Sequence, residues 1–363
     1  MREMKAAVLR APHGKFAVES ARIDGPRDNE VLVELVATGI CHTDLAVVEQ
    51  VLPLPPPIVL GHEGAGIVRE VGKAVTSVAP GDPVVLSFAS CGTCPQCAGG
   101  LPAYCDLFPV LNMSGRRPDG SSAIVDASNQ PVNSAFFSQS SFATHAIATT
   151  RNVVKVSKNA PLKYLGPLGC GFITGAGTVL NVLKPQRNST LAILGTGAVG
   201  FASLFAARLA GCERIVVVDR VKSRLDLARE LGATEVINTT ETNLEEALDA
   251  VGGVDFALDT TGVPKLIEAM VRKLKVRGVL ALVAVGQDRN FTTDIFHMVA
   301  GRVIRGAVEG EADPMTFIPF LVDEFMRGRF PIDRLSAFYP LDQINTAVSE
   351  GLSGKTIKPI LTF

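Results

Sequence analysis

The sequence predicts an α/β protein of two domains, the first rich in β-strands and the second built on a doubly wound parallel sheet. At 363 residues, the chain is longer than one ordinary hydrophobic core accommodates. β-rich runs, of which residues 31–36 are the clearest, dominate the first 90 residues. From about residue 172, short apolar strands alternate with helical segments, and this alternation is typical of parallel sheets covered by helices.

The composition excludes several classes of protein. Apolar residues make up 47% of the chain and charged residues 20%, which favours a packed core over disorder. The net charge of -1 gives no sign of a nucleic-acid or acidic-membrane partner. The N-terminus does not resemble a signal peptide, and no apolar run approaches the ~20 residues of a membrane span. We therefore expect a cytoplasmic protein.

The order of elements can be followed along the chain. Residues 1–40 are expected to form strands, residues 51–57 carry four prolines and predict a loop, and residues 67–90 are again strand-like. Residues 110–141 are rich in Ser, Asn, Gly and Pro, which predicts a long surface excursion. It returns to the core at Phe136, Phe137 and Phe142, aromatic residues that either anchor the core or line a pocket. Later strands are expected at residues 254–259, 279–285, 303–306 and 359–363, and a helix at residues 315–327.

Four of the seven cysteines are clustered. Cys91, Cys94, Cys97 and Cys105 follow the spacing Cys-x2-Cys-x2-Cys-x7-Cys. Four thiolates in one loop form a closed tetrahedral site for structural zinc. An iron–sulfur cluster is the competing interpretation, but the last gap is long for a bacterial ferredoxin and Asp106, not proline, follows the fourth cysteine.

A second group of potential ligands is spread over the chain. Cys41 opens the run Cys-His-Thr-Asp, His62 lies in Gly-His-Glu-Gly, and Cys170 stands between two glycines. Catalytic zinc commonly takes three ligands of mixed nitrogen and sulfur type and keeps a fourth position open. The alternative is that the two cysteines are small buried apolar residues and His62 is a hydrogen-bonded core histidine.

A glycine-rich turn predicts dinucleotide binding. The apolar strand at residues 191–194 runs into Gly195-Thr196-Gly197-Ala198-Val199-Gly200 and a helix, and the next strand ends on Asp219. A strand, a turn of this pattern, a helix and an acid about 20 residues later are the features of a nucleotide-binding βαβ unit. Asp219 would accept hydrogen bonds from the adenosine ribose, which favours NAD over NADP, although Arg220 keeps NADP open. The alternative is a glycine-rich turn without a ligand.

Together, these motifs resemble the zinc-dependent medium-chain alcohol dehydrogenases, over essentially the whole chain. The stretches at residues 139–144, 165–171 and 317–319 are similar to the bacterial aryl-alcohol (benzyl alcohol) branch. The resemblance implies a GroES-like β-barrel catalytic domain at residues 1–171 and 310–363, and a Rossmann NAD-binding domain at residues 172–309. It also implies two zinc ions per chain, one catalytic and one structural.

The resemblance assigns roles by matching position. Asp44 orients His62, Glu63 lies behind the metal, and Thr43 begins the path of the alcohol proton. Ala46 replaces a histidine that ends this path in the liver enzyme, so water or another group is expected to take the proton. The positions expected to bind the cofactor are His42, Gly195, Gly197, Val199, Gly200, Asp219, Arg224, Val285 and Lys358. The positions expected to line an apolar substrate pocket are Leu52, Phe88 and Phe142.

The implied activity is the reversible, NAD-dependent oxidation of primary aryl alcohols to aldehydes, with zinc as the Lewis acid and the nicotinamide as the hydride acceptor. Within this class, the alternatives are an allylic terpene alcohol dehydrogenase of the geraniol type and a glutathione-dependent formaldehyde dehydrogenase. From other classes, they are a non-catalytic zinc- and NAD-binding relative and a quinone-reductase-like protein. The physiological alcohol and the direction of reaction stay open. By resemblance, the strand near Val303 pairs across a two-fold axis in a homodimer or a homotetramer.

Overall fold

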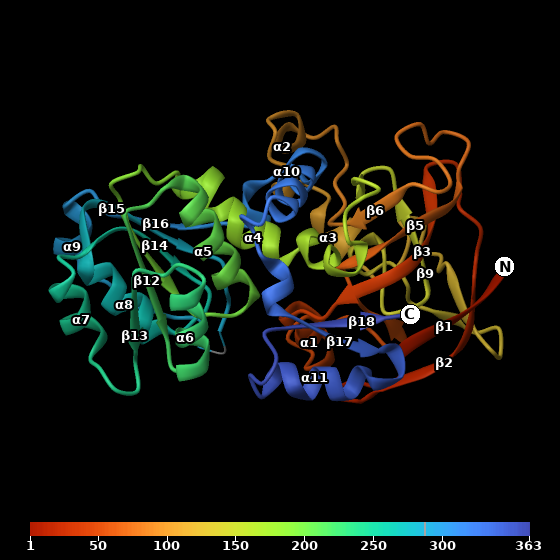
Figure 1. The fold of residues 1–363 in the computed structure, drawn as a ribbon. Coiled ribbons are helices and arrows are strands. Elements are labelled where there is room, and N and C mark those ends of the chain that lie inside the picture. Colours follow the sequence, from red (N-terminus) through yellow and green to blue (C-terminus); the bar gives the residue numbers. More distant parts are fainter. Residues whose placement is uncertain (287) are drawn as a thin grey trace. The chain divides into compact units, whose positions relative to one another are not determined.

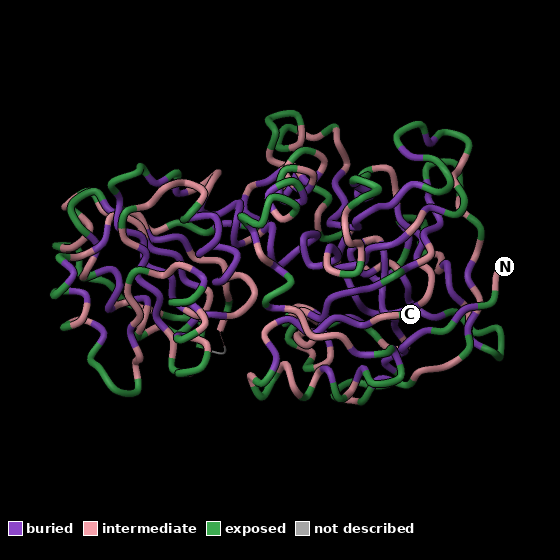
Figure 2. The backbone as a smooth tube through the Cα atoms, in the orientation of Figure 1, coloured by how far each residue is buried: buried purple, intermediate pink, exposed green. Residues whose placement is uncertain are grey.

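The computed structural model describes residues 1–286 and 288–363, and the chain forms two compact units (Figure 1). Unit 1 comprises Met1–Cys170 and Asp313–Phe363, and unit 2 comprises Gly171–Ala312. In both units, buried segments run through the interior and exposed segments lie mostly at the periphery (Figure 2). An α/β fold with a β-rich part and a parallel sheet is thereby confirmed.

Unit 1 is built on two sheets with a shared apolar interior. The first has the order β4 (Ile58–Val59), β1 (Arg2–Leu9), β2 (Phe16–Ile23), β7 (Ile124–Asp126) and β8 (Pro131–Val132). The second has the order β10 (Val153–Lys155), β6 (Pro83–Leu86), β5 (Gly64–Val71), β3 (Glu30–Gly39), β18 (Lys358–Thr362) and β17 (Ser336–Pro340), and β9 (His145–Thr149) also pairs with β3. The C-terminal strand β18 runs antiparallel to β3, so the tail is part of the same unit as the N-terminal strands.

Short helices connect these strands. The α-helices of unit 1 are α1 (His42–Val48), α2 (Pro95–Ala98), α3 (Phe108–Asn112), α10 (Pro314–Met326) and α11 (Ile344–Leu352). Its 3-10 helices are η1 (Pro102–Tyr104), η2 (Phe136–Ser138), η3 (Leu162–Tyr164), η4 (Gly166–Gly169), η7 (Ile332–Leu335) and η8 (Leu341–Gln343). The helix expected at residues 315–327 is α10.

The excursion expected at residues 110–141 is only partly on the surface, and that prediction is corrected. Strands β7 and β8 extend the first sheet beyond β2, and residues 132–134 are buried. Polar side chains there make internal hydrogen bonds: the Asn133 amide nitrogen donates to the carbonyl of Pro55 (2.6 Å), and the Ser134 hydroxyl accepts from the amide of Ala123 (3.0 Å). Polar composition predicted exposure, but buried polar groups that find hydrogen-bond partners are compatible with a core.

Unit 2 contains one parallel sheet of six strands. Its order is β13 (Glu235–Asn238), β12 (Arg214–Asp219), β11 (Thr190–Leu194), β14 (Val254–Asp259), β15 (Leu274–Leu282) and β16 (Val303–Gly306). Each neighbouring pair is parallel. Strand β15 begins five residues before the predicted run at 279–285 and ends three residues earlier. The chain builds outward from β11 in one direction and then from β14 in the other, so the strand order reverses between these two, where such sheets bind ligands.

Helices cover both faces of this sheet. They are α4 (Gly171–Gly177), the π-helix η5 (Thr178–Leu183), α5 (Ala198–Ala210), α6 (Lys222–Glu230), α7 (Leu244–Ala250), α8 (Pro264–Lys273) and α9 (Ile295–Val299), with the 3-10 turn η6 (Glu309–Glu311). Ala192 and Leu194 of β11 share a core cluster with Leu248 of α7 and Met270 of α8. Ile193, which points to the opposite face, lies next to Gly200 of α5. The sheet is therefore doubly wound, as predicted.

No helix in the described part of the chain is long and apolar enough to cross a membrane.

A buried ion pair within residues 110–141 leads to a prediction on stability. Arg117 is buried and donates two hydrogen bonds to the buried Glu30 (2.8 Å each) and one to Asp24 (3.1 Å). Arg117→Ala leaves Glu30 buried without its charged partner, so we expect the free energy of unfolding to fall by about 3–5 kcal/mol in urea titrations. Arg69→Ala removes the exposed ion pair with Glu34 and is the matched control, with an expected loss below about 1 kcal/mol. Equal losses for the two variants would contradict the prediction.

Candidate active site and metal centres

Four side chains of unit 1 converge on one point. Cys41 lies between β3 and α1, His62 and Glu63 lie between β4 and β5, and Cys170 follows η4. Their ligand atoms all lie within 4.8 Å of one another. Gly169 allows this approach, because a Cβ at its position would lie 2.0 Å from the carbonyl oxygen of Leu86. The three residues that the sequence predicts as ligands of catalytic zinc are thus brought together, with Glu63 beside them.

The carboxylate of Asp44 organises this cluster from within α1. It accepts hydrogen bonds from the backbone amides of Cys41 (2.9 Å) and Gly61 (3.0 Å) and lies 2.9 Å from Nδ1 of His62. Asp44 and His62 are fully buried. A carboxylate at this distance holds the proton on Nδ1, so Nε2 keeps a free lone pair.

The Nε2 atom of His62 supplies a test of whether a metal fits. It is buried and has no hydrogen-bond partner among the described residues. A buried imidazole nitrogen without a partner is costly unless something else occupies its lone pair. A hydrogen bond with Cys170 and the nearby His62 lower the pKa of Cys41 well below its ordinary value, in spite of desolvation. One nitrogen and two sulfur donors of this kind fit zinc.

Glu63 and Lys358 form a buried ion pair next to the cluster. The Lys358 ammonium lies 2.5 Å from Oε2 of Glu63 and donates to the carbonyl of Ile40 (3.1 Å). Burial raises the pKa of Glu63, and the positive charge of Lys358 opposes this effect. Lys358 therefore already has two partners within unit 1, and its expected contact with the cofactor pyrophosphate stays a prediction.

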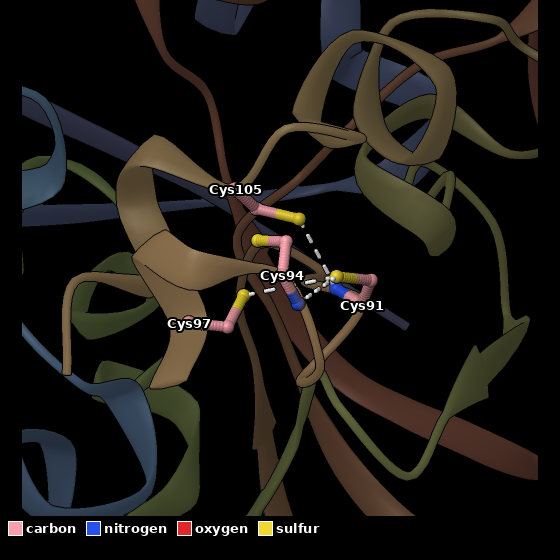
Figure 3. Close-up of side chains that lie close together, drawn as sticks. All are labelled: Cys91, Cys94, Cys97 and Cys105. Carbon is pink, nitrogen blue, oxygen red and sulfur yellow. Dashed lines mark hydrogen bonds between the residues drawn. The ribbon is translucent and has the colours of Figure 1, made fainter. Parts of the chain in front are cut away.

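The four-cysteine lobe, residues 91–105, forms a second centre. Cys91 and Cys94 come from a loop, Cys97 from α2 and Cys105 from the segment before α3, and their sulfur atoms turn toward one shared space (Figure 3). The amides of Thr93 and Cys94 lower the pKa of Cys91 to about 6, whereas burial raises that of Cys97 to about 12. Four thiolates so close together repel one another unless a cation offsets their charge. The lobe therefore fits a closed zinc site, as predicted.

The glycine-rich turn of unit 2 has the geometry expected of a phosphate-binding turn. Gly195 has a φ of +95°, and a Cβ at Gly200 would lie 1.9 Å from the carbonyl oxygen of Gly195. Gly197 caps the N-terminus of α5, where a Cβ would meet nothing within 4 Å. A pyrophosphate at this helix end would meet free backbone amides and the positive end of the helix dipole.

Asp219 lies at the end of β12, beside this turn. One carboxylate oxygen accepts from the amide (2.7 Å) and the hydroxyl of Thr196, and the other accepts from the amides of Arg220 (2.7 Å) and Val221 (2.9 Å). Thr196, which sequence reasoning did not single out, thus fixes the orientation of the acid. Of the other predicted cofactor residues, Arg224 is half-buried on α6, and Val285 in unit 2 and His42 in unit 1 are exposed.

The predicted substrate residues occupy different surroundings in unit 1. Phe88 packs at a tilt against Phe108 (5.9 Å), Phe142 packs edge-on against Phe16 (5.6 Å) in the core, and Leu52 is half-buried against the same core. Phe137, by contrast, stacks directly on the His62 ring, with centroids 4.5 Å apart. The paired phenylalanines at 136 and 137 were visible in the sequence, but nothing in their spacing placed them beside His62.

Comparisons with known proteins agree with this geometry. Residues 27–158 match the alcohol dehydrogenase GroES-like domain, and residues 198–324 match the zinc-binding dehydrogenase domain. The chain is 43% identical to the geraniol dehydrogenase of Castellaniella defragrans, over 99% of this chain and 97% of that protein.

Two solved structures have the same fold throughout. The crystal structure of benzyl alcohol dehydrogenase from Acinetobacter calcoaceticus matches with a TM-score of 0.97 at 43% identity and covers 100% of both chains. An alcohol dehydrogenase zinc-binding domain protein from Burkholderia ambifaria matches with a TM-score of 0.98 at 49% identity, over 100% of this chain and 99% of that one. Fold and site thus define a zinc-binding oxidoreductase. The chain belongs to the zinc-dependent medium-chain alcohol dehydrogenase family.

The hydrogen bond between Asp44 and His62 yields a prediction on metal binding. In Asp44→Asn, the amide no longer provides a negative charge to hold the Nδ1 proton, so we expect zinc affinity at the Cys41–His62–Cys170 site to fall about 10- to 100-fold. Dialysis against a chelator followed by metal analysis should then leave only the zinc of the four-cysteine lobe. Asp82→Asn alters another buried aspartate, paired with Lys155, and should retain both ions. Retention of both ions by Asp44→Asn would refute this role of the carboxylate.

Proposed function

We propose that this protein catalyses the reversible oxidation of primary alcohols to aldehydes with NAD⁺, and that aryl alcohols of the benzyl type are its substrates. The observation that carries the proposal is the set of three donors from Cys41, His62 and Cys170, in which Nε2 of His62 makes no hydrogen bond to the described residues. Three protein ligands leave one position of a tetrahedral metal open to a substrate.

The residues around the open position have distinct tasks in this proposal. Zinc held there supplies a Lewis acid that polarises the alcohol oxygen and lowers its pKa. The Thr43 hydroxyl, 3.7 Å from the sulfur of Cys41, is placed to accept the alcohol proton. Ala46 offers no polar group to pass this proton on, so water or another group takes it. The ammonium of Lys358 lies beside the buried carboxylate of Glu63 and opposes the rise in its pKa that burial causes.

Asp219 supports NAD over NADP as the cofactor. Its carboxylate is held beside the glycine-rich turn by Thr196, where a negative charge would repel a 2′-phosphate and accept a hydrogen bond from a 2′-hydroxyl. Arg220 is the feature that favours NADP, but its side chain is exposed.

The relatives support two classes of alcohol. Similarity to benzyl alcohol dehydrogenase over the whole chain favours an aryl alcohol. Similarity to geraniol dehydrogenase at the same identity favours an allylic terpene alcohol as the second candidate. Both classes carry the hydroxyl on a saturated carbon that is bonded to an unsaturated one, and the aromatic side chains of Phe88, Phe108 and Phe137 suit either.

Further features support an oligomer in a reducing compartment. Strand β16 forms an edge of the sheet, and Val276, Ile295, Phe296, Val299 and Val303 are exposed apolar residues in this part of unit 2. We propose that a second copy of this chain covers them, as a homodimer or within a homotetramer. None of the seven cysteines, all of which lie in the described part of the chain, forms a disulfide, which suits the cytoplasm.

An assay of reduced nicotinamide formation tests the activity. Benzyl alcohol and geraniol are each offered with NAD⁺ and with NADP⁺, and we expect faster turnover of benzyl alcohol with NAD⁺. Cys41→Ser removes one thiolate of the site and should reduce kcat/KM by at least about 100-fold, because a serine hydroxyl is a poor zinc ligand. Cys212→Ser changes a cysteine outside both clusters and should retain wild-type activity.

The possible outcomes separate the candidates. Turnover of geraniol alone would move the substrate to the terpene class and leave the reaction unchanged. Faster turnover with NADP⁺ would reverse the cofactor assignment. An intact protein that holds two zinc ions and oxidises neither alcohol would overturn the proposed oxidation and favour a non-catalytic binding protein.

A further inference from the structure

The ring of His62 is clamped by two aromatic side chains. Phe137 stacks on the imidazole with centroids 4.5 Å apart and planes at 25°, and Phe136 meets it edge-on at 5.3 Å. The two phenylalanines also contact each other edge-on at 5.0 Å. The hydrogen bond to Asp44 fixes one atom of the imidazole, Nδ1, but leaves rotation about that contact. Ring stacking limits this remaining freedom, so the clamp defines where Nε2 points.

The backbone that carries Phe137 is strained. Phe137, Ser138 and Ser140 have φ values of 49°, 52° and 49°, a left-handed conformation that is strained for residues other than glycine. Such a turn persists only where its surroundings hold it. Strain of this kind next to a proposed metal ligand indicates that the position of the Phe137 ring is itself constrained.

Buried amide side chains hold the turn in place. The Gln139 amide donates to the carbonyls of His62 (3.0 Å) and Ser87 (3.1 Å), and its oxygen accepts from the amide of Gly64 (3.1 Å). The Asn152 amide donates to the carbonyls of Phe137 (3.2 Å) and Ser138 (3.1 Å). The turn is therefore bonded both to the residue it clamps and to the neighbouring strands.

A second set of contacts joins the turn to the four-cysteine lobe. Phe108, the first residue of α3, meets Phe137 edge-on at 6.1 Å, and its amide donates to the carbonyl of Cys105 (2.8 Å). The Ser138 hydroxyl donates to the carbonyl of Leu111 in α3 (2.6 Å). Asn112, fully buried in the same helix, exchanges hydrogen bonds with Ala89 (2.8 and 2.9 Å), two residues before Cys91. Helix α3 thus contacts the segments at both ends of the lobe and, on another side, the turn that carries Phe137.

We propose that Phe137 and Phe108 are positioning residues that connect the four-cysteine lobe to the imidazole of His62. The lobe sets the position of α3, Phe108 sets the position of Phe137, and Phe137 sets the ring plane of the metal ligand. The proposal rests on the proposed function only in that a metal binds at Cys41, His62 and Cys170; it does not depend on which alcohol is oxidised. It gives the lobe a task beyond local stability.

The proposal is tested by replacing zinc with cobalt at the Cys41–His62–Cys170 site while zinc stays in the lobe. The readout is the visible absorption spectrum. The ligand-field bands of tetrahedral Co²⁺ respond to ligand angles, independently of turnover. Phe108→Leu should shift these bands and weaken cobalt affinity. We expect a loss of about 10-fold, the lower end of the 10- to 100-fold loss typical when a residue that orients a metal ligand is mutated. Phe108→Tyr keeps the ring at a half-buried position and should retain the wild-type spectrum.

Two further variants separate positioning from general loss of packing. Phe137→Leu should shift the bands more than Phe108→Leu, and the double variant should match Phe137→Leu because the two act in series. Phe16→Leu removes a ring of the same unit that packs on Phe142 and has no ring contact with His62, and its spectrum should stay that of the wild type. In the lobe, Cys97→Ser should shift the bands in the same direction as Phe108→Leu.

The outcomes are distinguishable from failure of the proposed function. If the wild-type chain shows no cobalt bands typical of mixed sulfur and nitrogen ligation, the metal site itself is wrong. If the wild type shows them and Phe108→Leu is indistinguishable from it, the metal site stands and the positioning proposal is overturned. Equal shifts in Phe108→Leu and Phe16→Leu would also overturn it. Phe108 is half-buried, so we expect its variants to fold. They therefore test the positioning proposal even if Phe137→Leu does not fold.

Discussion

The carboxylate of Asp44 is the constraint on which the rest of the site depends. Its two oxygens accept hydrogen bonds from the backbone amide of Cys41, just before α1, and from that of Gly61, just before His62. One of these oxygens also holds Nδ1 of the imidazole. One fully buried charge therefore joins the segments that carry two of the three proposed ligands. A hydrogen bond to a charged group contributes about 1.5–3 kcal/mol, and an unpaired carboxylate at this depth would cost far more. The buried charge is tolerated because both oxygens of the carboxylate accept hydrogen bonds.

The two metal centres differ in how the chain builds them. The four-cysteine lobe gathers its ligands within 15 residues, so short turns and α2 are sufficient to form it. The site at Cys41, His62 and Cys170 gathers ligands across 130 residues and depends on the sheets, on Gly169 and on the turn that carries Phe137. A site of this kind depends on contacts between distant segments of unit 1. In the proposed function, the local site is closed and the long-range site keeps a position open for substrate.

The features that could be predicted from the sequence are those with a local chemical signature. Cysteine spacing predicted the lobe, and the strand, glycine-rich turn and acid predicted the nucleotide-binding unit, because both depend on residues close in the chain. The clamp of Phe136 and Phe137 on His62 could not be predicted, since their left-handed turn is held by Gln139 and Asn152 through contacts distant in sequence. For the same reason, the polar excursion at residues 110–141 was expected on the surface, although Asn133 and Arg117 find partners inside.

Anomalous diffraction at the zinc edge, from crystals of the purified protein, would locate the metal ions. We expect two zinc positions per chain. One lies about 2.3 Å from the sulfurs of Cys41 and Cys170 and about 2.0–2.1 Å from Nε2 of His62, with the fourth position held by a non-protein ligand. The other lies among the four sulfurs of the lobe. A zinc ion at the first site with Glu63 as a fourth protein ligand, or no zinc there at all, would contradict the claim that this site is open to an alcohol.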